Sequence, residues 1–134
     1  MGRTLRELSI VFSAGVLGGL ANSVTVWIFG VLGVTQSVGV DMAPPLTLSW
    51  LYPRLVWGGI WGFLFLIPLF RGKTALRGFV FSLAPTIVQL YWVFPYQLDK
   101  GMMGLDLGAF TPIFVIFFNF IWGLVAALWV KAAK

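Results

Sequence analysis

The stretch FTPIFVIFFNFIWGLVAALWV, residues 110–130, carries one amide and no charged side chain. A helix rises 1.5 Å per residue, so about 20 apolar residues are needed to cross the roughly 30 Å hydrocarbon core of a bilayer. Three other segments have this character, at about residues 8–30, 50–70 and 79–96. Because these segments have almost no polar helix face, the sequence predicts four transmembrane helices rather than buried helices of a soluble domain.

The composition of the whole chain supports this prediction. Of its 134 residues, 60% are hydrophobic and only 10% are charged, whereas soluble domains carry about 25% charged residues. We therefore expect an all-α integral membrane protein, a four-helix bundle that forms a single membrane domain over residues 1–134. Its predicted outer links are residues 31–49 and 97–109, and its predicted inner link is residues 71–78.

The basic residues predict how the chain is oriented. Seven of the nine Lys and Arg residues lie before the first span, between the second and third, or after the fourth: Arg3, Arg6, Arg71, Lys73, Arg77, Lys131 and Lys134. Basic residues are concentrated on the cytoplasmic side of membrane proteins. The pattern predicts a protein of the cell (inner) membrane with both termini in the cytoplasm.

The N-terminal segment has a second interpretation. Residues 1–7 are charged, residues 8–17 are apolar, and Gly19-Leu20-Ala21 is a small-residue site, which together are typical of a cleaved signal peptide. The apolar run continues through Val24, Val26 and Trp27, however, as a membrane anchor does. We therefore expect a first helix that is retained.

Two short matches indicate an internal repeat. Val11-Phe12-Ser13 matches Val80-Phe81-Ser82, and Ile60-Trp61-Gly62 matches Ile121-Trp122-Gly123. A true duplication would relate two helical hairpins of like orientation by an axis along the membrane normal. Matches this short also arise by chance in hydrophobic sequences, so both interpretations stay open.

Neutral polar residues lie within three of the spans, and they have two interpretations. An amide without a partner in hydrocarbon costs several kcal/mol. The simpler interpretation is hydrogen bonding between helices, and the alternative is a narrow polar path for a small neutral molecule or an ion. The residues concerned are Ser13, Asn22, Thr25, Ser82, Thr86, Gln89 and Asn119.

Arg54 is the one charged residue within the predicted spans, near the outer end of the second. The simpler expectation is that its side chain extends to the outer headgroups or pairs with Asp41. The alternative is a clamp for an anion or a lipid phosphate at the mouth of the bundle.

Small residues in the first two spans predict close helix packing. Glycine allows two helix backbones to approach where lipid is as apolar as leucine. The glycines concerned are Gly15, Gly18, Gly19, Gly58 and Gly62, of which the last two have the GxxxG spacing.

The remaining residues exclude most catalytic chemistry. The chain has no Cys and no His, which removes disulfides, thiolate or imidazole metal ligands, and histidine bases. There is no nucleophile beside a base and no phosphate-binding loop, so we expect no enzyme activity, no metal and no cofactor. A nucleic-acid partner would need a soluble basic face, which the sequence does not have.

Three functions agree with this sequence. The first is a packing or accessory subunit that contacts membrane lipids and either itself or another membrane protein. The second is a small-solute or ion channel or transporter, with a neutral polar path between the first, third and fourth spans. The third is a lipid- or quinone-binding membrane protein with Arg54 at the headgroup.

Overall fold

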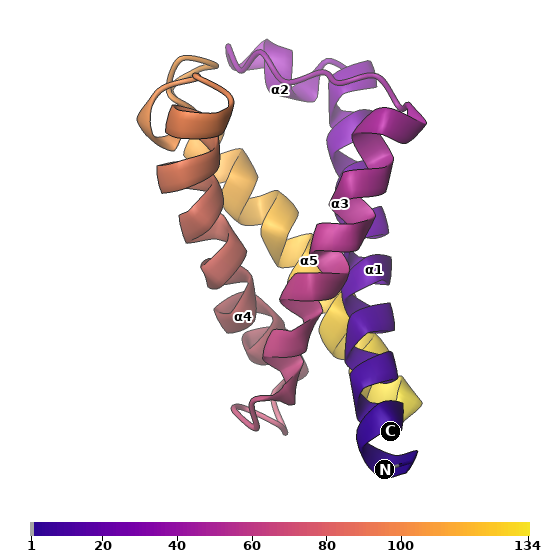
Figure 1. Ribbon diagram of the computed structural model, residues 1–134. Helices are drawn as coiled ribbons and strands as arrows, with labels where there is room; N and C mark the ends of the chain where they lie inside the picture. Colours follow the sequence, from indigo (N-terminus) through magenta and orange to yellow (C-terminus); the bar gives the residue numbers. More distant parts are fainter. Residues whose placement is uncertain (1) are drawn as a thin grey trace.

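The computed structural model describes residues 2–134, and these residues form helices and loops without any strand. The elements in chain order are α1 (Gly2–Val31), α2 (Val34–Ser37), α3 (Leu48–Trp61), η1 (Gly62–Leu66), α4 (Thr74–Val88), η2 (Gln89–Gln97), η3 (Met102–Gly104) and α5 (Thr111–Ala133). Both termini and the link at residues 67–73 lie at one end of the molecule, here called the terminal end (Figure 1). Residues 32–47 and 98–110 lie at the opposite end, called the loop end.

Three helical segments are long and apolar enough to cross a membrane: Gly2–Val31, Thr74–Gln97 and Thr111–Ala133. The second of them combines α4 with η2. The absence of strands in residues 2–134 confirms the all-helical prediction, and these three helices support the predicted membrane character. The predicted third span, 79–96, begins earlier in the structure, at Thr74, and α4 continues without a break into η2, which ends at Gln97. Pro85 does not end that helix, and η2 is a wider π-helical segment that begins at Gln89.

The predicted second span, 50–70, begins and ends earlier in the structure. α3 covers 14 residues and η1 continues it for five more, so the helical rod ends at Leu66. Ile67 is extended, with φ −74° and ψ 123°, because the ring of Pro68 disfavours helical backbone at the preceding residue. This segment is therefore shorter than predicted, and it is divided between two kinds of helix.

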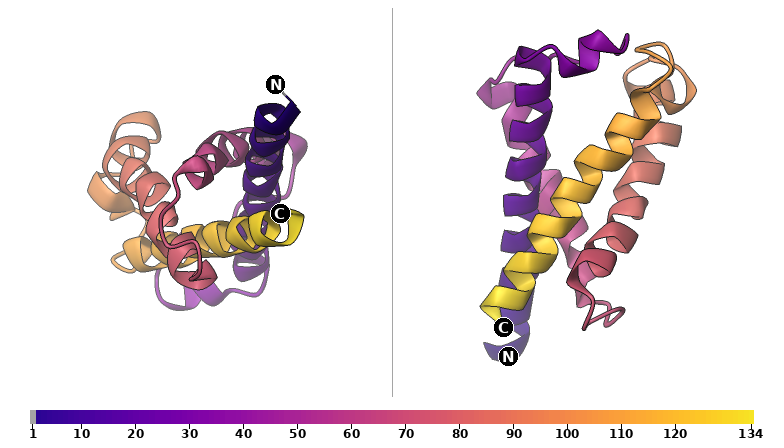
Figure 2. Two further views of the ribbon diagram at one scale, coloured as in Figure 1. Left: turned by 90° about the horizontal axis from the view of Figure 1, so that it is seen from below. Right: turned by 180° about the vertical axis from the view of Figure 1, so that it is seen from behind.

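The helices pack in the order α3, α1, α5, α4, so that α3 and α4 are the two edges of the arrangement. In the view from behind, α5 crosses in front of the other helices from the loop end to the terminal end, where it meets α1 (Figure 2, right). The hairpins α1/α3 and α4/α5 run in the same sense (Figure 1). A parallel repeat requires this orientation, and the duplication itself stays a prediction.

Glycine contacts hold each hairpin together. A Cβ atom at Gly15 would overlap the carbonyl oxygen of Gly58, and one at Gly62 would overlap that of Val11. Between α4 and α5, Gly78 and Gly123 face each other in the same way. The other predicted packing glycines, Gly18 and Gly19, lie against the backbones of Trp122 and Arg54. All of these contacts are within the chain.

The terminal half of the bundle is filled by a hydrophobic core. Its buried members are Val11, Ala14, Phe65, Phe81, Trp122, Ala126, Ala127 and Val130. One cation lies beside this core. Arg77 is buried, packs over the rings of Phe65 and Phe81, and donates through Nη2 to the carbonyl oxygens of Phe65 (2.8 Å) and Ile67 (3.1 Å). Arg77 therefore caps the end of η1, where helical hydrogen bonding stops.

Arg77→Met is expected to destabilise the protein by about 2 kcal/mol, because the buried carbonyl group of Phe65 and the partly buried one of Ile67 would lose a charged donor. The measurement is the midpoint of unfolding by sodium dodecyl sulfate, followed by tryptophan fluorescence. Lys73→Met is the matched control, since Lys73 is an exposed cation four residues away. Equal midpoints for the two variants would show that the cap contributes nothing.

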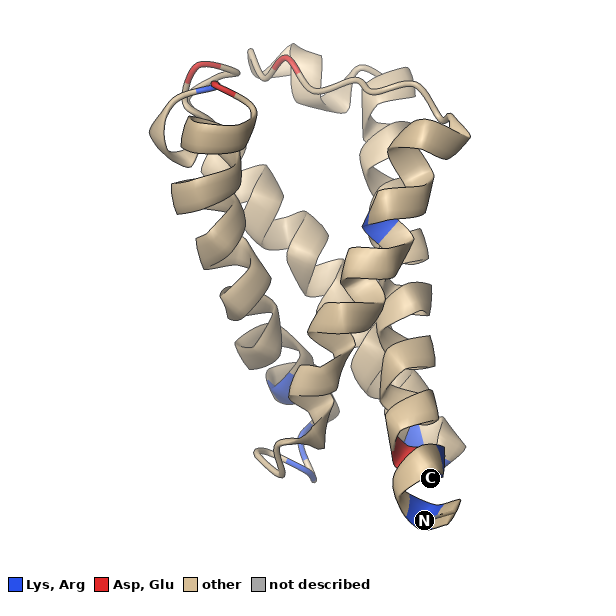
Figure 3. Ribbon diagram, viewed as in Figure 1, with Lys and Arg blue, Asp and Glu red and all other residues tan. Residues whose placement is uncertain are grey.

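Apart from Arg54, Lys100 and Glu7, the basic and acidic residues lie at opposite ends of the molecule (Figure 3). The basic residues at the start of α1, around the link at 67–73 and at the end of α5 all lie at the terminal end. Asp41, Asp99 and Asp106 lie in the loops at the opposite end. The asymmetry behind the predicted orientation is therefore present in three dimensions, while the side that faces the cytoplasm stays a prediction.

Candidate functional site

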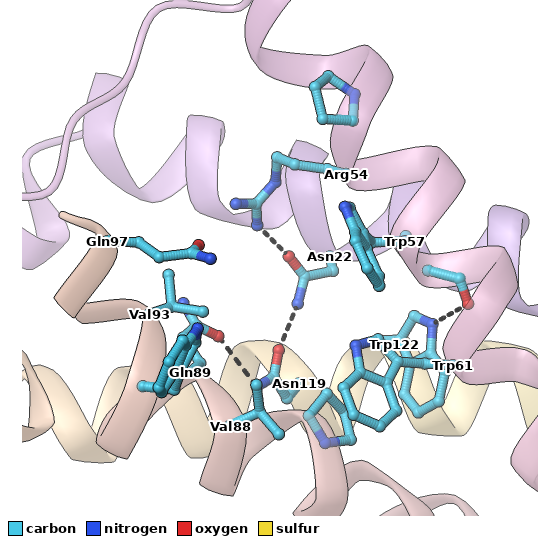
Figure 4. A pocket seen from close by; sticks show the side chains of 15 residues that line it. Asn22, Arg54, Trp57, Trp61, Val88, Gln89, Val93, Gln97, Asn119 and Trp122 are labelled. Carbon is cyan, nitrogen blue, oxygen red and sulfur yellow. Dashed lines mark hydrogen bonds between the residues drawn. The ribbon is translucent and has the colours of Figure 1, made fainter. Parts of the chain in front are cut away.

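Polar side chains from all four long segments meet halfway along the bundle. On α1, Gly15, Gly18, Gly19, Asn22 and Ser23 form one buried stripe, because residues three and four apart lie on the same helix face. The close glycine contacts bring α3 and α5 against this stripe. Asn22 is thereby placed between Arg54 of α3 and Asn119 of α5 (Figure 4).

A chain of hydrogen bonds joins these side chains. Arg54 donates from Nη2 to Oδ1 of Asn22 (2.6 Å), and Nδ2 of Asn22 donates to Oδ1 of Asn119 (3.1 Å) and to the carbonyl oxygen of Phe118 (2.7 Å). Nδ2 of Asn119 then donates to Oε1 of Gln89 (3.2 Å) and Oγ1 of Thr86 (3.0 Å). We call Arg54, Asn22, Asn119 and Gln89 the amide chain.

The arginine fixes the direction of this chain. A guanidinium group can only donate, so Asn22 must turn its oxygen to Arg54 and its nitrogen to Asn119. The same reasoning makes Gln89 accept from Asn119 through Oε1. Nε2 of Gln89 is left with two N–H groups, and it has no hydrogen-bond partner among residues 2–134. The chain therefore ends in free donors.

Arg54 lies differently from the sequence expectation. Its side chain turns inward, donates from Nε to Oγ of Ser23 (2.8 Å) and packs over the ring of Trp50, 4.6 Å from its centroid. Within residues 2–134 it pairs with no carboxylate, Asp41 included, and all its hydrogen-bond partners are neutral. The side chain turns inward because the contact of Gly19 with the Arg54 backbone holds this face of α3 against α1. Contact of Arg54 with a headgroup or an anion stays a prediction.

Two adjoining cavities lie against the amide chain. The larger, of about 450 Å³, lies between α3 and the α4–η2 rod, and the other, of about 410 Å³, lies toward the loop end. All four members of the amide chain line both cavities. The larger cavity is otherwise lined by Gly19, Pro53, Trp57, Gly58, Trp61, Pro85, Val88, Trp92, Val93, Gln97 and Trp122.

The structure brings together only part of the predicted polar set. Asn22, Thr86, Gln89 and Asn119 meet, but Ser13 is exposed on the far face of α1, because nine residues turn a helix by about 180°. Thr25 bonds to the carbonyl oxygen of Ala21 (2.7 Å). Ser82 bonds to that of Phe79 (2.7 Å). The seven residues do not form one continuous polar path.

Sequence reasoning also missed several residues of the site. Ser23 is next to Asn22, and only its bond to Arg54 distinguishes it from the other hydroxyl residues. Trp122 closes the cavity toward the terminal end, where its Nε1 donates to the carbonyl oxygens of Gly15 (3.1 Å) and Gly58 (3.3 Å). The repeated Ile-Trp-Gly pattern is the signal that could have found Trp61 and Trp122, because both line the larger cavity.

The lining of the larger cavity offers hydrogen-bond donors and no acid. Indole groups and arginine can only donate, and the lining has no Asp or Glu. Among residues 2–134, no group of three or more metal-binding side chains occurs. Comparison of the chain with protein-family models, curated protein sequences and solved structures gave no match.

Proposed function

We propose that this chain is a four-span protein of the inner membrane, with the terminal end in the cytoplasm, and that it binds an anionic group at Arg54. The fourth span in this proposal is α3 with η1, which runs along α1 from Leu48 to Leu66. The concentration of basic residues at the terminal end supports the orientation.

The observation that carries the anion proposal is the unpaired charge of Arg54. A charge within the hydrocarbon region costs several kcal/mol and is retained for a purpose. Arg54 has five N–H donors, and its two side-chain hydrogen bonds go to neutral oxygens. A carboxylate or phosphate in the larger cavity would compensate the charge of Arg54 and accept hydrogen bonds from its remaining N–H groups.

The amide chain supports the same ligand. Gln89 has free N–H groups and lines both cavities together with Arg54. Donors on opposite walls of one cavity favour a ligand that accepts hydrogen bonds from both. An anion with two or more oxygens has this property, whereas a metal cation would be repelled.

The other sequence-based functions gain less support. A conduit needs an opening at both ends, and the hydrophobic core below Trp122 fills the terminal half in this conformation. A packing subunit would use its small residues on other chains, and here the predicted glycines pack within the chain. Both functions stay predictions, as does the absence of enzyme activity.

The test uses anionic quenchers of tryptophan fluorescence, because Trp57, Trp61 and Trp92 line the cavity. Iodide offers an anion from water, and palmitate brominated at its chain end offers one from the bilayer. Each has a neutral counterpart, acrylamide and the corresponding brominated alcohol. In vesicles, we expect at least one anion to quench saturably where its neutral counterpart does not.

Arg54→Gln is expected to weaken this saturable quenching at least about tenfold, the effect of losing one charged hydrogen bond. Arg71→Gln is the control, because Arg71 is an exposed cation of the terminal end. The proposed function is wrong if both neutral quenchers quench as strongly as the anions. It is also wrong if the anions quench the Arg54→Gln variant as strongly as the unaltered protein.

A further inference from the structure

We propose that the anionic group belongs to an amphiphile from the bilayer, and that its hydrocarbon chain lies between α3 and η2. This inference rests on the proposed function, which leaves open whether the anion comes from water or from lipid. Three features of the cavity decide between these sources: its roof, its floor and its open side.

The roof is formed where the two long loops meet. The backbone N–H of Asp41 donates to the carbonyl oxygen of Leu107 (2.9 Å), and Gly108 lies against the carbonyl of Gly39. Val40 between them is fully buried. The segment after α2 thus crosses the loop end from one hairpin to the other (Figure 1). This crossing covers part of the loop end, where the smaller cavity is lined by the exposed Asp41 and Lys100.

The floor of the larger cavity is closed by Trp122 and the core. Trp122 joins α5 to the backbones of α1 and α3, and the packed core lies below it. A ligand therefore does not reach Arg54 from the terminal end in this conformation.

The open side lies between the two edges of the bundle. α3 and the α4–η2 rod are the two ends of the packing order, and the larger cavity lies between them. Trp57 on one edge is 59% exposed and Trp92 on the other is 55% exposed, although both line the cavity. They therefore form its rim, which faces lipid if the chain spans the membrane as proposed.

The lining of this opening changes from polar to apolar. Arg54 and Gln89 supply donors, whereas Trp61, Pro85 and Val88 supply apolar surface toward the floor. A ligand that matches both parts has a carboxylate or phosphate at one end and a hydrocarbon chain at the other. A fully hydrated small anion would leave the apolar part of the cavity unmatched.

The test compares the two anionic quenchers in vesicles and adds a variant that fills the apolar part. We expect the brominated palmitate to quench the fluorescence in a way that depends on Arg54. A large excess of butyrate or phosphate in the water should not reverse this quenching. Val88→Phe should weaken this quenching about tenfold. Ile87→Phe is the matched control, because Ile87 is the next residue, is 57% exposed and does not line the cavity.

The outcomes separate the two proposals. If iodide shows the Arg54-dependent quenching, or if butyrate or phosphate displaces the palmitate, the anion comes from water; the proposed function then holds and this inference fails. The inference also fails if Val88→Phe and Ile87→Phe have equal effects. If no anion shows dependence on Arg54, both proposals fail.

Discussion

Gly15→Ala is expected to unfold most of the protein in mild detergent, because the added methyl group has no space between α1 and α3. Its Cβ would overlap the carbonyl oxygen of Gly58 and lie 2.9 Å from the Cα of Gly59. Both are backbone atoms, so no side chain can rotate away, and the two helices must separate. We expect a loss of about 3 kcal/mol or more.

The loss of stability should exceed the cost of the steric clash alone, because the contact between Gly15 and Gly58 also supports Trp122. The indole of Trp122 donates to the carbonyl oxygens of both Gly15 and Gly58. Separation of α1 from α3 would break at least one of these hydrogen bonds and open the core beside them. The effect is measured as the midpoint of unfolding by sodium dodecyl sulfate, with helical circular dichroism as the signal.

Gly2→Ala is the control for this prediction. It makes the same substitution in the same helix, at a position where a Cβ atom meets open space. Alanine is a better helix former than glycine, so Gly2→Ala should leave the midpoint unchanged or raise it slightly. A midpoint for Gly15→Ala equal to that of Gly2→Ala would mean that α1 and α3 do not pack as described.

Asn22→Asp is expected to weaken anion binding about a hundredfold, or about 2.8 kcal/mol. The substitution barely changes the shape of the side chain, but it places a carboxylate where the amide oxygen now lies, 2.6 Å from Nη2 of Arg54. The arginine would then be paired within the protein and would no longer attract an external anion. The measurement is the saturable quenching by the anionic quenchers defined above.

The same substitution would also remove a donor. A carboxylate at this position could not donate to the carbonyl oxygen of Phe118 or to Oδ1 of Asn119, as the amide of Asn22 does. Thr25→Val is the control, because Thr25 is a polar residue of the same helix whose hydroxyl bonds only to the carbonyl of Ala21. If Asn22→Asp binds the anion as tightly as Thr25→Val, the charge of Arg54 is not what the ligand recognises.

The sequence by itself determined the helical, membrane character of the chain. Long apolar segments without charges can satisfy their backbone hydrogen bonds in hydrocarbon only as helices or closed barrels. Their length predicted four spans, and the structure has three helices long and apolar enough to cross a membrane. Composition also determined that the buried amides needed partners, because an unsatisfied amide in an apolar environment is costly. Asn22, Asn119 and Gln89 do hydrogen-bond with one another along the amide chain.

Only the tertiary structure decided which face of each helix meets which neighbour. Hydropathy is nearly uniform around these helices, so it does not fix their rotation. The rotation is set by close backbone contacts such as those of Gly15 with Gly58 and Gly78 with Gly123. These contacts turn Arg54 inward to Ser23 and leave Ser13 exposed on the far face. The cavity and its free donors follow from that rotation, which depends on atoms far apart in the chain.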